Sequence, residues 1–170
     1  MTYCVAVTLN AGMVFASDSR TNAGVDQVAS YRKMRVFSRE GDRVIVILSS
    51  GNLSITQNAI NLLQEDQREG GKKRTLYDAR SMYEVAEMVG QALRDVRKRD
   101  APYLEQANVS AGASFIVGGQ IAGERERLFH VYSEGNFIES TAETTYFQIG
   151  ESKYGKPVID RVITPETSLL

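Results

Sequence analysis

Thr2 is the residue of this sequence that is best placed to act as a catalyst, because it follows the initiator Met1. Removal of Met1 would leave Thr2 with both a hydroxyl and a free α-amine. An α-amine has an ordinary pKa of about 7.7–8.0, so near neutral pH a useful fraction can accept the hydroxyl proton while Oγ attacks a carbonyl. Because many chains begin with Met-Thr, the dipeptide alone is a weak signal of catalysis.

Asp18, Lys33 and Gly51 are the residues that could support such a nucleophile. A lysine ammonium close to the amine would lower the pKa of the amine and favour its basic form, and a carboxylate would hold the lysine in place. An ordinary surface salt bridge, worth about 0–1 kcal/mol, is the alternative for Asp18 and Lys33. Gly51 stands where an apolar strand gives way to a helix, so its N–H could stabilise a developing negative charge. Its alternative is a plain strand-to-helix turn.

The sequence contains one cysteine, Cys4, and one histidine, His130. A single cysteine cannot form an intrachain disulfide, and the two residues cannot supply the roughly four ligands of a structural zinc site. They could act together as nucleophile and base, but both lie among apolar residues of predicted strands, which favours structural roles. The sequence therefore indicates no metal or organic cofactor, and a reducing, cytoplasmic environment is the default expectation.

The composition is that of a folded chain rather than of a disordered, membrane-spanning or nucleic-acid-binding one. The 170 residues are 42% hydrophobic and 24% charged, which favours a single domain over residues 1–170. With 20 Lys and Arg against 21 Asp and Glu, the net charge of −1 gives no basic surface for nucleic acid. The longest strongly apolar run, residues 44–48, is far shorter than the roughly 20 residues of a membrane helix, and the N-terminus lacks the features of a signal peptide.

Apolar periodicity predicts two blocks of strands, with two helices between them and a third helix at the end. Residues 2–9 and 13–18 are typical of a hairpin about a turn at 10–12, which would bring Thr2 within a residue or two of Asp18. The continuous apolar run 43–50 predicts a strand covered on both faces. This order of elements fits an α+β layered domain with helices packed on antiparallel sheet. The other predicted elements are strands at 33–37, 111–118, 126–133 and 144–149 and helices at about 52–65, 81–99 and from 151, with no element in 21–30 and an exposed connection over 64–80 that includes the basic residues 72–74.

Several strings in the sequence resemble the proteasome-like N-terminal-nucleophile hydrolases, and most closely their bacterial Anbu (ancestral beta subunit) branch. The likeness spans nearly the whole chain, and the first 24 residues are highly specific. The matching strings are Met-Thr-Tyr-Cys-Val at 1–5, Phe-Ala-Ser-Asp-Ser-Arg-Thr-Asn-Ala-Gly at 15–24, Tyr-Arg-Lys-Met at 31–34, Ser-Ser-Gly-Asn at 49–52, Gln-Ile-Gly-Glu at 148–151 and Lys-Tyr-Gly-Lys-Pro at 153–157.

The resemblance implies a four-layer αββα sandwich and hydrolysis of peptide bonds by an N-terminal threonine, without metal or organic cofactor. Carried over by position, Thr2 would be the nucleophile and, through its amine, the base. Asp18 and Lys33 would orient and tune that amine, and the Gly51 N–H would help to form the oxyanion hole. The resemblance also implies self-association into a ring or an open spiral that acts on peptides or unfolded proteins in the cytoplasm.

The chain departs from the family pattern at three points, and two alternative functions stay open. Lys33 lies one residue closer to Thr2 than in the usual spacing, and the usual Gly-Ser step beside the N-terminus reads Gly150-Glu151-Ser152 here. Family members also continue through further strands that contribute an Asp and a Ser, so we expect the C-terminal part of the family fold to be absent. The alternatives are a catalytically weak or inactive assembly or scaffold subunit and a small-molecule amidase of the same fold.

Overall fold

The computed structural model describes residues 2–23, 26–64, 74–151, 153 and 155–169. Two sheets pack face to face in it, a five-stranded larger sheet and a three-stranded smaller sheet, and the N-terminal hairpin belongs to the smaller one. Strands β1 (Tyr3–Leu9) and β2 (Gly12–Ser17) pair as predicted, and β10 (Tyr146–Gly150) pairs with the other edge of β1. Cys4 and Ala6 have no exposed surface, because alternate residues of β1 point toward the second sheet. The order of strands in this sheet is β10-β1-β2.

The larger sheet carries the apolar strand that the sequence predicts to be covered on both faces. Ile45 and Ile47 of that strand, β6, pack against the helices, and Val46 and Leu48 pack against the smaller sheet. This alternation confirms the prediction and explains why residues 43–50 lack the apolar–polar pattern of a half-exposed strand. The strands are antiparallel neighbours in the order β5 (Met34–Arg39), β6 (Arg43–Gly51), β7 (Ala113–Ile121), β8 (Arg127–Val131) and β9 (Phe137–Glu139).

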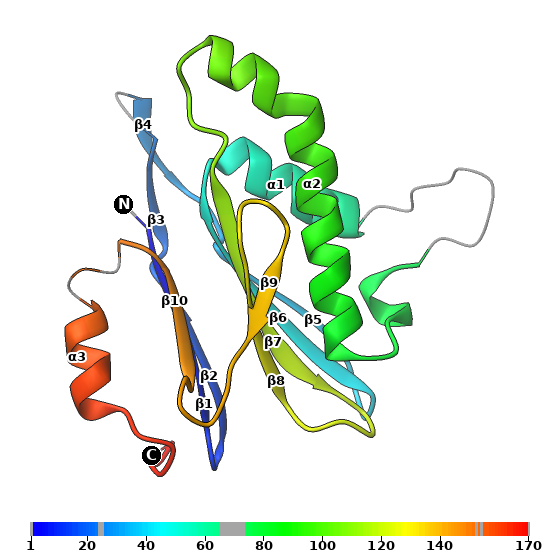
Figure 1. Cartoon of the computed structure of the whole chain (residues 1–170), viewed down its shortest axis with the longest axis vertical. Coiled ribbons are helices and arrows are strands. Elements are labelled where there is room, and N and C mark those ends of the chain that lie inside the picture. Colours follow the sequence, from blue (N-terminus) through cyan, green and yellow to red (C-terminus); the bar gives the residue numbers. More distant parts are fainter. Residues whose placement is uncertain (1, 24–25, 65–73, 152, 154, 170) are drawn as a thin grey trace.

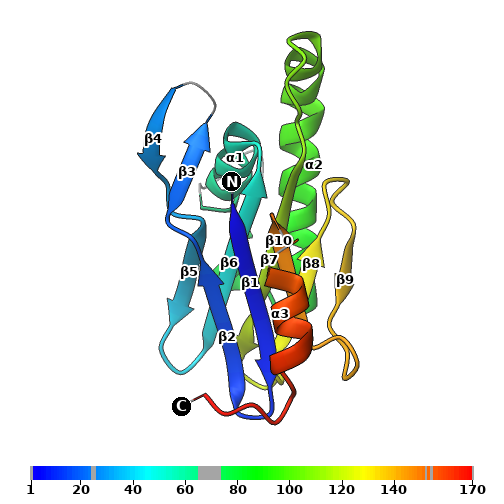
Figure 2. The same ribbon diagram turned by 90° about the vertical axis from the view of Figure 1, so that its left-hand side faces the viewer.

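Helices lie on the outer sides of both sheets. Helices α1 (Leu53–Gln64) and α2 (Met82–Gln106) pack on the larger sheet, and α3 (Gly155–Val162) lies outside the smaller one (Figure 1). The predicted αββα sandwich is therefore present, with β1 running between β2 and β10 up to the N-terminus (Figure 2). None of the helices in the described part of the chain combines the length and the hydropathy that a bilayer span requires.

The structure differs from the predicted elements where apolar periodicity is weak. The stretch 21–30, expected to have no element, forms strands β3 (Arg20–Ala23) and β4 (Asp26–Ser30), which pair with each other. The three-residue strand β9 is too short to give a pattern. Helix α2 continues to residue 106 rather than 99, because its fully buried stripe ends at Val96 while the helix runs on with more exposed residues. Helix α3 begins at residue 155 rather than 151.

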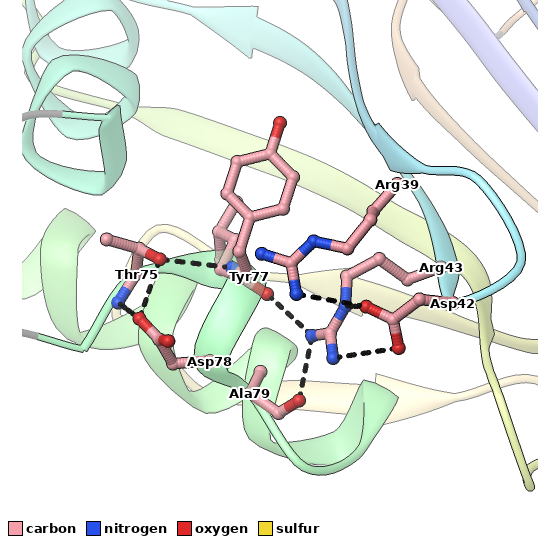
Figure 3. A network of polar contacts seen from close by, with 8 residues as sticks. Arg39, Asp42, Arg43, Thr75, Tyr77, Asp78 and Ala79 are labelled. Carbon is pink, nitrogen blue, oxygen red and sulfur yellow. Dashed lines mark hydrogen bonds and ion pairs between the residues drawn. The ribbon is translucent and has the colours of Figure 1, made fainter.

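The expected exposed connection over 64–80 is partly wrong, and an arginine explains why. Residues 65–73, with the basic residues 72 and 73, lie outside the described residues, but the short helix η1 (Leu76–Asp78) packs inward and Leu76 is 1% exposed. Arg43 donates from Nη1 to the backbone carbonyls of Leu76 (3.0 Å) and Ala79 (2.8 Å) and from Nε to Asp42 (2.7 Å) (Figure 3). The start of β6 therefore holds this segment against the sheet.

We expect Arg43→Met to lower the free energy of unfolding by about 1–3 kcal/mol, because two carbonyls lose their donor at a nearly buried place. Arg39→Met is the matched control, since Arg39 contacts the same Asp42 at 3.3 Å from a side chain that is 57% exposed. It should cause little change. Urea titrations followed by circular dichroism measure both, and equal losses would contradict the structural role of Arg43.

Candidate active site

Thr2 lies at the end of β1, where the hairpin brings Asp18 beside it. The backbone N–H of Tyr3 donates to Asp18 Oδ1 at 2.8 Å, and the backbone N–H of Asp18 donates to the carbonyl of Tyr3 at 3.0 Å. Asp18 follows β2 directly, so its backbone extends the ladder of the hairpin while its side chain reaches the residue next to Thr2. The folding of the hairpin therefore fixes the carboxylate beside the N-terminus.

The other side of Thr2 is bounded by the end of β10. The backbone N–H of Glu151 donates to the carbonyl of Thr2 at 2.7 Å. Gly150 has φ +90°, and a Cβ there would overlap the carbonyl oxygen of Thr2. A glycine is thus required at this position both by its backbone conformation and by the close approach of the chain. Glu151 itself contacts Thr2 through its backbone, and Ser152 lies outside the described residues.

Lys33 joins the larger sheet to Asp18. Its side chain is 3% exposed, and its Nζ donates to Asp18 Oδ2 at 2.5 Å. The carbonyl of Lys33 accepts from the backbone N–H of Ser49 at 2.9 Å, which continues the β5–β6 ladder by one pair. Lys33 therefore approaches Asp18 from a position directly before β5 that is itself hydrogen-bonded to β6.

The Lys33 contact keeps Asp18 ionised near neutral pH. Partial burial acts to raise the pKa of Asp18, but the hydrogen bonds from Lys33 and from the Tyr3 backbone outweigh it and hold the pKa below the ordinary value. The site consequently contains a fixed ion pair next to the first residues of β1.

Cys4 and His130 occupy separate structural places. Burial, together with the negative charge of Asp18, raises the pKa of the Cys4 thiol to about 12 against the opposing effect of Lys33. The thiol therefore stays protonated and lies 3.7 Å from the carbonyl of Ser49. His130 packs against the ring of Tyr132 at a centroid distance of 4.4 Å, and burial lowers its pKa. These surroundings favour the structural interpretation of both residues.

Gly51 ends β6 in a conformation that only glycine adopts easily. Its φ is +101°, and a Cβ there would overlap the carbonyl oxygen of Gly112. Gly51 is two residues beyond Ser49, which binds Lys33, so the strand connects it to the ion pair.

Asn52, where the sequence predicts the first helix to begin, fixes the chain just after Gly51. Its Oδ1 accepts from the backbone N–H of Ser54 (3.0 Å), and its Nδ2 donates to the carbonyl of Ser110 (2.9 Å). Its backbone N–H donates to Gly112 (2.7 Å). The type of residue before α1 was the available signal, because asparagine is a preferred N-cap.

The arrangement offers a charged pair, a half-buried N-terminal region and a glycine at a strand end, but no metal-ligand set. Across the described ranges of the chain, no three His, Cys, Asp or Glu side chains gather as metal ligands would. The structure thus places Asp18 against Tyr3, the residue after Thr2, and Lys33 against Asp18. Gly51 lies two residues beyond Ser49, whose backbone N–H binds the carbonyl of Lys33.

Solved structures with the same fold decide the family. The chain is 48% identical to Anbu (ancestral beta-subunit) from Yersinia bercovieri, with a TM-score of 0.88 over 99% of this chain and 68% of that one. The chain belongs to the Anbu family. It is 46% identical to the chain in the helical assembly of the Anbu complex from Pseudomonas aeruginosa, with a TM-score of 0.90 over 99% of this chain and 68% of that one. For Anbu from Hyphomicrobium sp. strain MC1 the values are 48%, 0.87, 99% and 69%. No protein-family model matches this chain, and no curated protein matches it either.

We expect Asp18→Asn to lower the free energy of unfolding at pH 7 by about 1–3 kcal/mol, less than for a fully buried pair because Asp18 is 35% exposed. The folded pKa of Asp18 is depressed, so its contribution is present above the ordinary value of 3.8 and is lost as the pH falls from there through the folded pKa. The difference between wild type and variant should therefore narrow below about pH 4. Urea titrations from pH 7 to pH 3 test this.

Asp160→Asn is the control for Asp18, because Asp160 pairs with Lys156 at the surface at 3.3 Å. It should change stability little at any pH. A difference between wild type and Asp18→Asn that stays constant down to pH 3 would contradict the assignment.

Gly51→Ala should destabilise the protein more than Gly41→Ala. Both glycines have positive φ, +101° and +72°, so each alanine carries about 1 kcal/mol of backbone strain. Nothing lies within 4 Å of a Cβ at Gly41, whereas at Gly51 the backbone of Gly112 must move. Melting temperatures of the two variants measure the difference, and equal shifts would show that the strand end is not tightly packed.

Proposed function

We propose that this chain is a threonine-type peptidase subunit of a proteasome-like assembly, with Thr2 as its N-terminal nucleophile after removal of Met1. The observation that carries the proposal is the Lys33–Asp18 ion pair, whose carboxylate also accepts the N–H of the residue after Thr2. A cation held at this place favours the neutral form of a nearby amine. The membership of the Anbu family supports the same function.

The proposed reaction uses the amine and hydroxyl of Thr2 in two steps. In the first, the amine accepts the hydroxyl proton as Oγ bonds to the substrate carbonyl carbon, and the resulting ammonium returns that proton to the leaving amine as the peptide bond breaks. In the second, the amine accepts a proton from water as the water oxygen attacks the acyl ester, and the resulting ammonium returns that proton to Oγ, which leaves as the restored hydroxyl and releases the carboxylic acid product. The N–H of Gly51 stabilises the oxyanion in both steps.

The proposal includes self-association of the chain into a homo-oligomer, a ring or an open spiral. Anbu from Pseudomonas aeruginosa forms a helical assembly, and that chain is 46% identical to this one. Val158 and Val162, one turn apart on α3, are 58% and 60% exposed, which is typical of surfaces that contact another subunit. The proposed substrates are peptides or unfolded proteins in the cytoplasm.

Thr2→Ala should abolish both peptide cleavage and labelling by an electrophile directed at N-terminal threonine, with turnover reduced at least about a thousandfold. Intact mass first establishes that Met1 is absent, and mass spectrometry then locates the adduct. Thr8→Ala is the matched control, because Thr8 belongs to the same strand and should leave turnover unchanged.

Two results would reject the peptidase. Wild-type protein that lacks Met1 but is neither labelled at Thr2 nor able to cleave fluorogenic peptides would favour the scaffold subunit. Labelling without cleavage of any peptide, together with hydrolysis of small amides, would favour the amidase.

A further inference from the structure

Arg35 carries a positive charge that the described part of the protein leaves without a matching acceptor. Its Nε is buried and has no hydrogen-bond partner among the described residues. Its guanidinium carbon lies 5.7 Å from the centre of the Tyr31 ring, so the charge rests on an aromatic face rather than against a carboxylate. A buried donor without a partner is costly, and such groups are rare in folded proteins.

The backbone register places Arg35 beside the candidate active site. Arg35 lies opposite Ile47 in the β5–β6 ladder, and Lys33, two residues earlier, binds the N–H of Ser49. Residues two apart in extended chain point to the same side, about 7 Å from each other. Arg35 therefore emerges on the same side as the lysine that binds Asp18. Its stacking on Tyr31 turns the guanidinium back toward that end of β5.

A groove beside β5 gives a ligand access to this charge. It has a volume of about 470 Å³, and β5 is an edge strand of the larger sheet in the described part of the chain. Arg32, Arg35 and Gln64 supply side-chain donors, and Phe37 and Leu63 supply apolar surface. The described residues that line the groove include two arginines and no carboxylate.

Two other described arginines, one lining the other large pocket and one on β5, do have carboxylate partners. In the pocket between α2 and β9, Arg74 pairs with Glu84. Arg39, four residues along β5 from Arg35, pairs with Asp42. Among the described residues, the groove thus carries positive charge without a carboxylate, whereas the arginines of the neighbouring surface are paired with one.

We propose that Arg35, assisted by Arg32, binds an acidic side chain of the polypeptide substrate, so that Glu or Asp near the cleaved bond is preferred. This inference rests on the proposed peptidase function. A carboxylate would accept two hydrogen bonds from the planar guanidinium, including one from Nε, and would supply the missing acceptor. The ligand class is an acidic peptide.

Binding in the Thr2→Ala background tests the proposal without requiring turnover. The probes are the fluorescein-labelled hexapeptide Ala-Leu-Glu-Ala-Leu-Ala and its counterpart with Gln in place of Glu, measured by fluorescence anisotropy. We expect the Glu peptide to bind about tenfold more tightly at low salt, and the ratio to shrink as salt screens the charges.

Variants of Arg35 identify the residue responsible. Arg35→Met and Arg35→Gln should each reduce the ratio to about one, whereas Arg35→Lys should keep part of it because the charge remains. Arg39→Met removes one positive charge from the same strand and should keep the full ratio, since Asp42 already pairs with Arg39. Thermal melts identify any variant that fails to fold, and the second neutral variant then decides.

Equal affinity for the two peptides, or a preference that survives both neutral variants, would overturn the proposal. A preference that depends on Arg35 in a protein whose wild type neither labels at Thr2 nor cleaves peptides would retain the acidic-peptide site and reject the peptidase. The two failures are therefore distinguishable.

Discussion

The contact between Lys33 and Asp18 is the constraint on which the geometry around Thr2 depends. An ammonium that is 3% exposed would be costly to bury alone, and Asp18 at 2.5 Å offsets that cost. The two residues come from different sheets, so the ion pair also sets the separation of the sheets at this end. Because Asp18 accepts the Tyr3 N–H at the same time, any displacement of the lysine is transmitted to the first residues of β1.

The ion pair is part of a closed ring of contacts, and this ring explains why position 4 holds a buried cysteine. Cys4 lies one residue beyond Tyr3, and its thiol contacts the carbonyl of Ser49, whose N–H binds Lys33. Lys33 in turn binds Asp18, which binds Tyr3. A small side chain at position 4 is needed for the sheets to approach closely enough to close the ring. The thiol, with its pKa raised to about 12, fills that place without adding a charge.

The sequence predicts local elements of this site better than their long-range contacts. The hairpin and its turn are enough to place Asp18 near Thr2, because pairing in a hairpin is fixed by the turn. The approach of Lys33 crosses from one sheet to the other, and no local pattern records it. The sequence suggested the Lys33–Asp18 pair only through the chemistry that an N-terminal nucleophile needs and through the family resemblance. The β3–β4 hairpin was missed because its residues show no apolar alternation, and η1 was missed because the hydrogen bonds from the distant Arg43 hold it in place.

The arginines of the β5–β6 hairpin differ in whether the described protein supplies hydrogen-bond acceptors for their guanidinium groups. Arg43 has two carbonyls and Asp42 as acceptors, so its burial is explained within the fold. Arg97 also has a buried Nε without a partner in the described structure, but it donates through Nη1 to Ser133 and lies near Glu134. Arg35, by contrast, stacks on the Tyr31 ring, and no described residue accepts a hydrogen bond from its Nε. Because the described residues supply no acceptor to the Nε of Arg35, a carboxylate of a bound peptide would offset the cost of burying this donor, two residues along the chain from the Lys33 that binds Asp18.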